Sequence, residues 1–429
     1  MSTPAYEAVP ARSPVPILSC EEDTLAALHI AICNIPALGH VNPTLPLAAE
    51  LVARGHRVSY ATADRRAPEI EATGATLVPY RTTRPAESDP GMVLPDRETY
   101  LAHTMVNFIE EAAHTLPQLD AAFAADPPDV VLYDRLSFAG RIYAIRHGLP
   151  SVRMWPMLIS GEHWSLFRTA PFDEDHPLMV SYREKLADLL RWYRVDVSVA
   201  DFLDDPVPDA DIAFFPRRFQ YHGELFGDRY SFVGPCRQAP DGLPGRSASR
   251  PVALVSLGSV YNNQPEFYRS CVAAFAGSPW HVVLAVGERM DLAELAPLPD
   301  NVEAHAVVPQ TEVLAGSAVF VCHAGMGGLM EAMQAGVPVV TVPQTVEQES
   351  NAVRVEQLGL GVRLDPAGLT PQALRAAVDR AATDPGIAAH VARLRRDIAE
   401  AGGAVRAADV VEALPAARRT AAEARVALA

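Results

Sequence analysis

The segment 319–351, VFVCHAGMGGLMEAMQAGVPVVTVPQTVEQESN, combines a histidine, several glycines and carboxylates within one short stretch. An apolar run ends at Cys322, the loop 323–328 contains His323 and several glycines, and we expect a helix from about Leu329. Exposed amides at a helix N-terminus favour a phosphate, to which His323 can also donate a hydrogen bond. Glu331 follows one turn into the helix, where its carboxylate can accept protons from two ribose hydroxyls. The segment therefore predicts a nucleotide site.

An alternative reading of this segment is a tight turn in which the glycines only allow close packing. The glycines alone do not separate the two readings. The further presence of Glu347, Gln348 and Asn351 downstream favours the nucleotide site.

A second candidate is His40, which follows the apolar run 29–35 in the loop PALGH, just before a helix that Pro43 can start. A helix N-terminus disfavours the histidine cation, and a general base must be neutral to accept a proton. Asp134 ends another apolar run, at the sheet edge where the loop of His40 is also expected. An aspartate there can fix the imidazole tautomer and stabilise the imidazolium. Without such a partner, a loop histidine is more often structural.

The elements that must position these residues form two similar halves. Short apolar runs alternate with helical periodicity from residue 29, and the pattern restarts after the Pro- and Gly-rich stretch 237–250. This alternation is typical of parallel α/β sheets covered on both faces. We predict a flexible arm at 1–28, α/β domains at 29–236 and 251–410 joined by a linker at 237–250, and a helical tail at 411–429. A ligand between the domains would lie at the carboxyl ends of the strands.

Composition excludes several classes of protein. The chain has 52 acidic and 36 basic residues and a formal net charge of −16, which disfavours nucleic acid or a membrane as the main partner. The 5 cysteines show no metal-ligand spacing, and the first 28 residues lack the pattern of a signal peptide. We expect a cytoplasmic protein.

The aromatic-rich stretch 154–172 is a candidate wall for an apolar acceptor pocket, formed by Trp155, Trp164 and Phe167, or else a core helix. Two acidic triplets, 173–175 and 209–211, resemble a metal-binding DxD motif. Neither has a phosphate loop nearby, so we expect no metal.

The sequence resembles a known family over residues 29 to about 413. The pattern HAGxGGxxEAxxAGVPVVxVPQxxxQxxNA looks like the donor-binding signature of the family 1 glycosyltransferases. Together with VSLGS at 255–259, GHVNP at 39–43 and LVARGHRVSYA at 51–61, it is similar to the bacterial macrolide UDP-glycosyltransferases. The resemblance implies the GT-B fold, in which two Rossmann-like domains with parallel sheets face each other across a cleft.

The resemblance also implies roles for individual residues. His40 would be the general base and Asp134 its partner, with inversion at the anomeric carbon and neither a metal nor another cofactor. The first domain would hold the acceptor, and the donor would contact Ser259, Val308, Gln310, His323, Gly325, Gly327, Gly328, Glu331, Glu347 and Gln348.

The sequence departs from the family pattern at three of the donor positions. Val307 stands where relatives often have a tryptophan that stacks on uracil, and a valine side chain offers much less contact to that base. Gly328 replaces a Ser or Thr, which leaves phosphate binding to backbone amides, and Glu347 replaces an Asp.

Several functions stay open at this point. The first is transfer of a sugar such as glucose from UDP or dTDP to a hydrophobic natural product such as a macrolide, which with UDP-glucose would serve antibiotic inactivation. A dTDP-deoxysugar tailoring transferase in antibiotic biosynthesis, a nucleotide-sugar epimerase and a non-catalytic sensor are the alternatives. The acceptor is not defined, and the protein could be a monomer or a homodimer.

Overall fold

The computed structural model describes residues 26–86, 100–161, 163–166, 175–204, 208–237 and 250–414. The predicted arm at 1–28 lies almost entirely outside these residues, as do most of the linker and of the tail. Within the described ranges, no helix is long and apolar enough to cross a membrane.

The first half forms a seven-stranded sheet whose strands are all parallel, in the order β3-β2-β1-β4-β5-β6-β7. The central strand β1 is buried at every residue, because helices cover both faces of the sheet. The strands are β1 (His29–Cys33), β2 (Arg57–Thr62), β3 (Thr76–Pro79), β4 (Val130–Asp134), β5 (Ser151–Trp155), β6 (Ala210–Ala213) and β7 (Tyr230–Phe232).

Alternate residues of β1 point into two different hydrophobic clusters, as the two-residue period of a strand requires. Ile30 and Ile32 pack with α1 (Leu38–Ala53) and α2 (Ala67–Glu71), whereas Ala31 and Cys33 face the opposite layer. That layer consists of α3 (Tyr100–Ala122), α4 (Phe138–Arg146), α5 (Pro177–Trp192) and α6 (Val199–Asp204).

The second half is a six-stranded parallel sheet in the order β10-β9-β8-β11-β12-β13. Its strands are β8 (Val252–Ser256), β9 (His281–Ala285), β10 (Val302–His305), β11 (Val319–Cys322), β12 (Val339–Thr341) and β13 (Gly361–Arg363). Its helices are α7 (Pro265–Phe275), α8 (Gln310–Gly316), α9 (Met326–Ala335), α10 (Val346–Gln357), α11 (Pro371–Thr383) and α12 (Pro385–Glu400).

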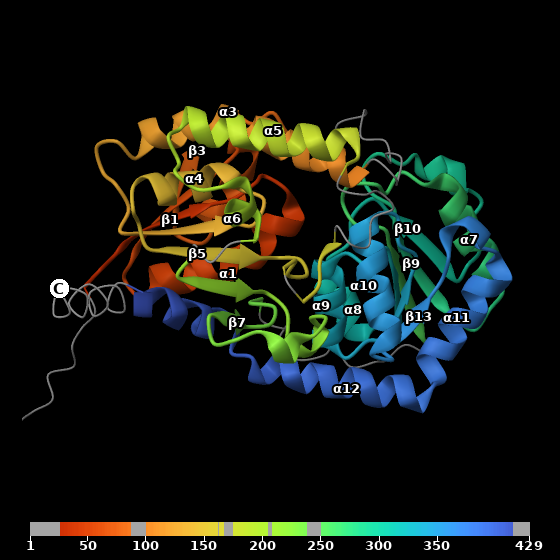
Figure 1. Ribbon diagram of the computed structural model, residues 1–429. Coiled ribbons are helices and arrows are strands. Elements are labelled where there is room, and N and C mark those ends of the chain that lie inside the picture. Colours follow the sequence, from red (N-terminus) through yellow and green to blue (C-terminus); the bar gives the residue numbers. More distant parts are fainter. Residues whose placement is uncertain are drawn as a thin grey trace, which may run out of the picture.

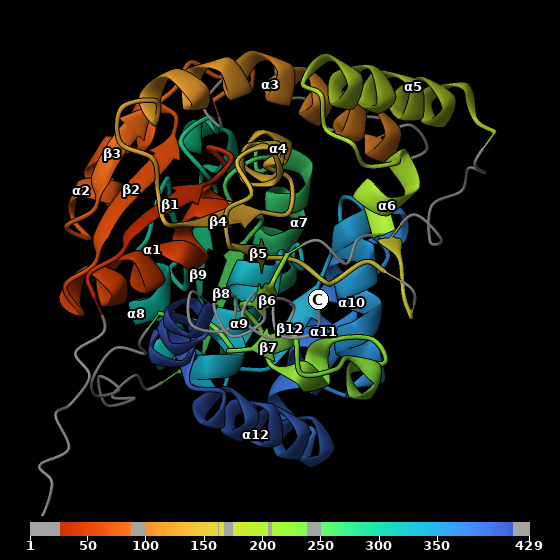
Figure 2. The ribbon, with the colours of Figure 1, turned by 60° about the vertical axis from the view of Figure 1, so that its left-hand side comes forward.

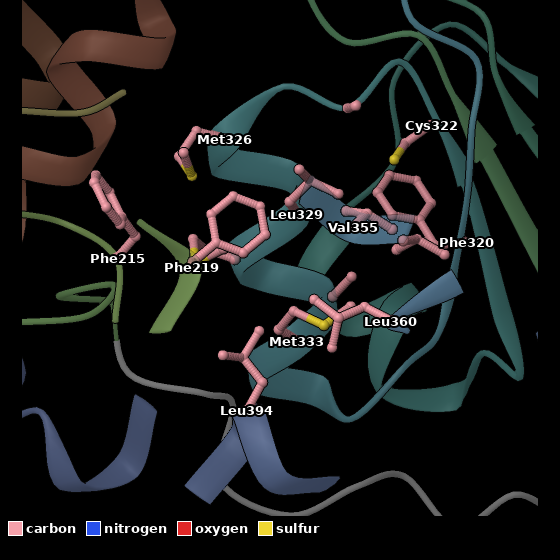
Figure 3. Packing of buried hydrophobic residues seen from close by; sticks show 14 of the residues in the cluster. Phe215, Phe219, Phe320, Cys322, Met326, Leu329, Met333, Val355, Leu360 and Leu394 are labelled. Atoms are coloured by element: carbon pink, nitrogen blue, oxygen red, sulfur yellow. The ribbon is translucent and has the colours of Figure 1, made fainter. Parts of the chain in front are cut away.

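A hydrophobic cluster joins the two domains. Phe215 and Phe219 come from the first domain and pack in one cluster with Met326 and Leu329 of α9 (Figure 3). Polar contacts support this boundary, because the Arg354 guanidinium on α10 donates to the carbonyls of Arg218, Phe219 and Gln220 at 2.8 to 3.0 Å.

The predicted boundary at residue 410, between the second domain and the tail, falls inside a single helical segment, 403–414. After α12 the chain crosses back beneath the first domain (Figures 1 and 2). Ala407, Ala408, Val411 and Leu414 are buried in the cluster that contains Ile30. The guanidinium of Arg54, the residue directly after α1, also donates to Asp409 and Glu412 of this helix. Residues 403–414 therefore complete the first domain, because their apolar face covers its sheet.

The acidic triplet 209–211 lies at the start of β6. Asp211 is fully buried and accepts hydrogen bonds from Arg153 at 2.6 Å, Trp155 at 2.7 Å and Arg229 at 2.8 Å. This aspartate is a structural counter-charge. Most of the other triplet, 173–175, lies outside the described residues.

Gly140 of α4 lies so close to β1 and β4 that a Cβ would collide with the Cβ of Cys33 and come within 3.1 Å of that of Tyr133. We expect Gly140→Ala to destabilise the protein by about 1–3 kcal/mol, because the helix must move away from the strand that carries Asp134. Gly316→Ala is the matched control, since a Cβ there meets nothing within 4 Å. Chemical denaturation checks both variants, and equal stability of the two would contradict the packing argument.

Candidate functional site

The His40 imidazole and the Asp134 carboxylate meet at the carboxyl edge of the first sheet. The Nδ1 of His40 donates to the Oδ2 of Asp134 at 2.8 Å, and the other carboxylate oxygen accepts from the Leu136 amide at 2.8 Å. Asp134 is fully buried, whereas the His40 side chain keeps 16% of its surface exposed. The aspartate thus fixes one ring nitrogen and leaves Nε2 as the nitrogen that can exchange a proton.

The sequence predicted His40 in a loop before the helix, but His40 lies in the first turn of α1. Helix α1 begins at Leu38, and the amides of His40 and Val41 both donate to the Ala37 carbonyl at 2.9 Å. Pro43 is inside the helix, where a proline removes one backbone hydrogen bond without preventing the turns on either side.

Asn34 holds the start of α1 in place, and sequence reasoning missed it. Its Nδ2 donates to the His40 carbonyl at 2.9 Å and to the hydroxyls of Thr44 and Tyr60 at 3.3 and 3.0 Å. Its place directly after β1 was the only signal in the sequence. A fully buried amide with these partners fixes the backbone that carries the histidine.

The pKa of His40 corrects the expectation that the helix end would favour neutral imidazole. Burial is the largest single influence and lowers this pKa, but the charge and hydrogen bond of Asp134 and the charge of Glu347 together raise it by more. The net result is a pKa above the ordinary value, because two carboxylates outweigh burial and the opposing charge of Arg84.

The glycine-rich loop of the second domain ends in an uncapped helix. Helix α9 begins at Met326, three residues earlier than predicted, with Gly325 as an N-cap that has no side chain to accept a hydrogen bond. The first-turn amides of Met326, Gly327 and Gly328 therefore lack a side-chain cap, and they carry the positive end of the helix dipole. A Cβ at Gly327 would meet nothing within 4 Å, so the approach to this turn is open.

The His323 ring lies between two glycines. A Cβ at Gly258 or Gly325 would come within 2.5 Å of the imidazole, so close packing requires glycine at both positions. The following residue, Ala324, adopts a left-handed φ of 66°. Burial lowers the pKa of His323 to about 4, so its ring is neutral at pH 7 and can donate one hydrogen bond without carrying charge. Its Nδ1 has no partner among the described residues.

The remaining predicted donor residues lie around these amides. Gln310, at the start of α8, donates through Nε2 to the Oε2 of Glu331 at 2.6 Å, which holds that carboxylate in one orientation. Ser259 is exposed in the loop after β8, Val308 is half-buried, and Val307 is 68% exposed. The structure brings Gln310 and Glu331 together and leaves Val307 uncovered.

Glu347 and Gln348 open helix α10 across the boundary from His40. The Gln348 Oε1 accepts from the amides of Gln344 and Thr345 at 2.8 and 3.3 Å, which forms a capping box with the Thr345 hydroxyl. Gln348 therefore has a structural role besides the predicted one. Burial raises the pKa of Glu347, and the charge of His40 opposes this rise, so the two side chains interact electrostatically.

The predicted acceptor wall is only partly brought together. Trp155 is 1% exposed, with its indole N–H on Asp211, so in this conformation the ring offers no face to an acceptor. This part of the prediction is wrong, because β5 directs the side chain into the core. Trp164 is half-buried and stacks on Tyr221 at 5.0 Å between ring centroids. Phe167 lies outside the described residues.

Buried polar atoms without a hydrogen-bond partner gather at the carboxyl ends of the strands. In the described part of the second domain they include Oδ1 of Asn262, Nδ1 of His323, Oγ1 of Thr341, both amide atoms of Gln344 and Oδ1 of Asn351. Such atoms are rare in folded proteins unless a ligand or water pairs them. No group of three or more His, Cys, Asp or Glu side chains in the described ranges could hold a metal ion.

Two parallel α/β domains, an uncapped glycine-rich helix end in one and a histidine–aspartate pair in the other define a glycosyltransferase of the GT-B fold. Solved structures agree: the calicheamicin glycosyltransferase CalG4 has a TM-score of 0.80 and 39% identity, over 91% of this chain and 98% of that one. The glycotransferase of kitacinnamycin has a TM-score of 0.78 and 38% identity, over 90% of this chain and 98% of that one. Both agreements confirm the predicted fold.

Sequence comparisons identify the family within this fold. Residues 273–414 match the family described as "Erythromycin biosynthesis protein CIII-like, C-terminal domain". The NDP-glycosyltransferase YjiC of Bacillus licheniformis is 38% identical over 390 residues, 90% of this chain and 97% of the relative. The oleandomycin glycosyltransferase of Streptomyces antibioticus is 37% identical over 401 residues, 90% of this chain and 91% of the relative. The chain belongs to the family 1 glycosyltransferases of the macrolide type, as the sequence motifs predicted.

We expect the two site histidines to titrate on opposite sides of the ordinary histidine range. The His40 pKa lies above its usual value of 6.5 and the His323 pKa at about 4, so near pH 6 the first ring is charged and the second is neutral. Asp134→Asn should lower the His40 pKa, since it removes the charge that raises it. Nuclear magnetic resonance of the imidazole Cε1–H groups, assigned with His40→Asn and His323→Asn, measures both values. An unchanged His40 pKa in Asp134→Asn would contradict this electrostatic account.

Proposed function

We propose that this enzyme transfers a hexose, with glucose first, from a nucleoside diphosphate to a hydroxyl of a bulky, largely apolar natural product such as a macrolide. The observation that carries the proposal is the 2.8 Å hydrogen bond from His40 Nδ1 to Asp134, which leaves Nε2 as the proton acceptor. Relatives named for oleandomycin and for demethyllactenocin support a macrolide-like acceptor.

In the proposed reaction, His40 Nε2 removes the proton of the acceptor hydroxyl while its oxygen attacks the anomeric carbon. Asp134 stabilises the imidazolium that forms, and the bond from the anomeric carbon to the diphosphate breaks on the opposite face. This direct displacement inverts the anomeric configuration. The amides of Gly327 and Gly328, neutral His323 and the helix dipole stabilise the charge on the leaving diphosphate. These groups supply the stabilisation without a metal.

The donor has two candidates within this proposal. UDP-glucose agrees with the motif around Glu347 and Gln348, and the Glu331 carboxylate would accept hydrogen bonds from the ribose hydroxyls. A dTDP-deoxysugar stays the alternative, because exposed Val307 gives little stacking area to identify uracil, and because one relative is named a mycarosyltransferase. The enzyme would act in antibiotic inactivation in the first case and in biosynthesis in the second.

His40→Ala should lower kcat/KM by about 10²-fold or more, because the general base is lost. The matched control is His114→Ala, which changes an exposed histidine of α3. Steady-state rates with several acceptors test this, and full activity of His40→Ala with all of them would exclude the assignment. In the wild-type enzyme the rate should rise with pH through a value above 6.5, since the base form of His40 appears only as its raised pKa is passed.

A matrix of nucleotide-sugars against acceptors, read by mass spectrometry, tests the reaction itself. We expect a mass gain of one hexose on macrolide-like acceptors, with UDP-glucose giving the most product. Rearrangement of the donor without an acceptor would instead indicate an epimerase. Donor binding with no product across the whole panel would exclude the transferase proposal.

A further inference from the structure

Gln344 has a buried amide that no described residue pairs. The side chain is 9% exposed, and neither its Nε2 nor its Oε1 has a hydrogen-bond partner. An unpaired amide inside a protein lowers stability, so such groups usually persist where a ligand completes them. The established roles of the site do not account for this side chain.

The turn that carries Gln344 does not depend on the side-chain amide. Gln344 lies between the end of β12 at Thr341 and the start of α10 at Val346. Its backbone N–H donates to the Gln348 Oε1 at 2.8 Å, so the capping box of α10 already fixes the turn. The nearby Thr341 hydroxyl is also buried and unpaired. Unsatisfied polar groups therefore concentrate where α10 begins.

The helix that follows this turn contacts both the loop of His323 and the base. Asn351 of α10 donates to the Ala324 carbonyl at 3.0 Å, which ties the helix to the loop of His323. Three residues after Gln344, the Glu347 carboxylate interacts electrostatically with His40. The group that must lie between the leaving diphosphate and the base is the transferred sugar.

We propose that Gln344 binds a hydroxyl of the donor hexose and that the enzyme thereby selects hydroxylated donor sugars over the corresponding deoxysugar. This inference rests on the proposed function, because it assumes a nucleotide-sugar in this position. A primary amide offers one acceptor and two donor hydrogens, and a sugar hydroxyl can both accept and donate. A donor that lacks that hydroxyl leaves the amide unpaired, and sites built in this way reject such analogues strongly.

The test compares wild type with Gln344→Met, which keeps the length of the side chain and removes both polar atoms. Gln357→Met is the matched control, because Gln357 is an exposed glutamine at the end of α10, the helix that follows Gln344. The probes are UDP and dTDP, their glucose conjugates, and the 2-, 3-, 4- and 6-deoxyglucose conjugates. Calorimetry gives the affinities, and steady-state rates with an accepted macrolide give kcat/KM.

We expect wild type to prefer the glucose conjugate over at least one deoxy conjugate by about 10²-fold in kcat/KM. Gln344→Met should bring this ratio close to one without changing the affinity for the free nucleoside diphosphate. Its melting temperature should not fall, since an apolar side chain replaces a buried unpaired amide. Gln357→Met should behave like wild type.

Equal loss of all donors in Gln344→Met, or equal use of all deoxy conjugates by wild type, would overturn the inference. A lower melting temperature with unchanged donor ratios would mean that the amide is structural and paired by water. Binding separates this inference from the proposed function. If wild type binds glucose conjugates but transfers to no acceptor, the transferase proposal fails, and the ratio of affinities still decides the role of Gln344. No binding of any conjugate overturns both.

Discussion

Parallel strand pairing is the constraint on which the rest of this molecule depends. All strands of each sheet run in the same direction, so the connections that follow them all begin at the same edge of that sheet. Backbone amides and short polar side chains collect there, while the strands themselves are buried and apolar. His40 and Asp134 lie at one such edge and His323 and Gln344 at the other. Helix α1, which begins beside His40, contacts α9, and the charge of Glu347 on α10 reaches His40 across the same boundary.

Features with a local signal could be predicted from the sequence. The central strands appear as short apolar runs, and the glycine-rich loop at 323–328 identifies a helix N-terminus by composition alone. The expected proximity of His40 and Asp134 came from the rule that parallel strands of one sheet end at the same edge, whereas their roles as base and partner came from the family resemblance. The fold class was confirmed for the same reason, since regular alternation of strands and helices leaves few other arrangements.

Features that depend on distant partners could not be predicted. β6 and β13 are short, and they become strands because a neighbouring strand pairs with them. The sequence showed Asp211 only as part of a triplet that resembles a DxD motif, because its counter-charges, Arg153 and Arg229, are far away in the sequence. The direction of the His40 pKa shift could not be predicted, because it depends on the balance between burial and two carboxylates, one from each domain. The starts of α1 and α9 were predicted too late in the sequence, because proline and glycine were interpreted as residues that a helix excludes.

The return of the chain to its starting domain has a consequence for synthesis. The first domain is translated first, but part of its hydrophobic core, at Ala407, Ala408, Val411 and Leu414, comes at the end of the described chain. The sheet of the second domain is contiguous from Val252 to Arg363, so it can form while those residues are still being added. Helical segment 403–414 can cover its apolar surface on the first domain only after most of the chain has been translated. The domain made first is the one completed last, and a chaperone that binds nascent apolar surfaces would encounter it in that interval.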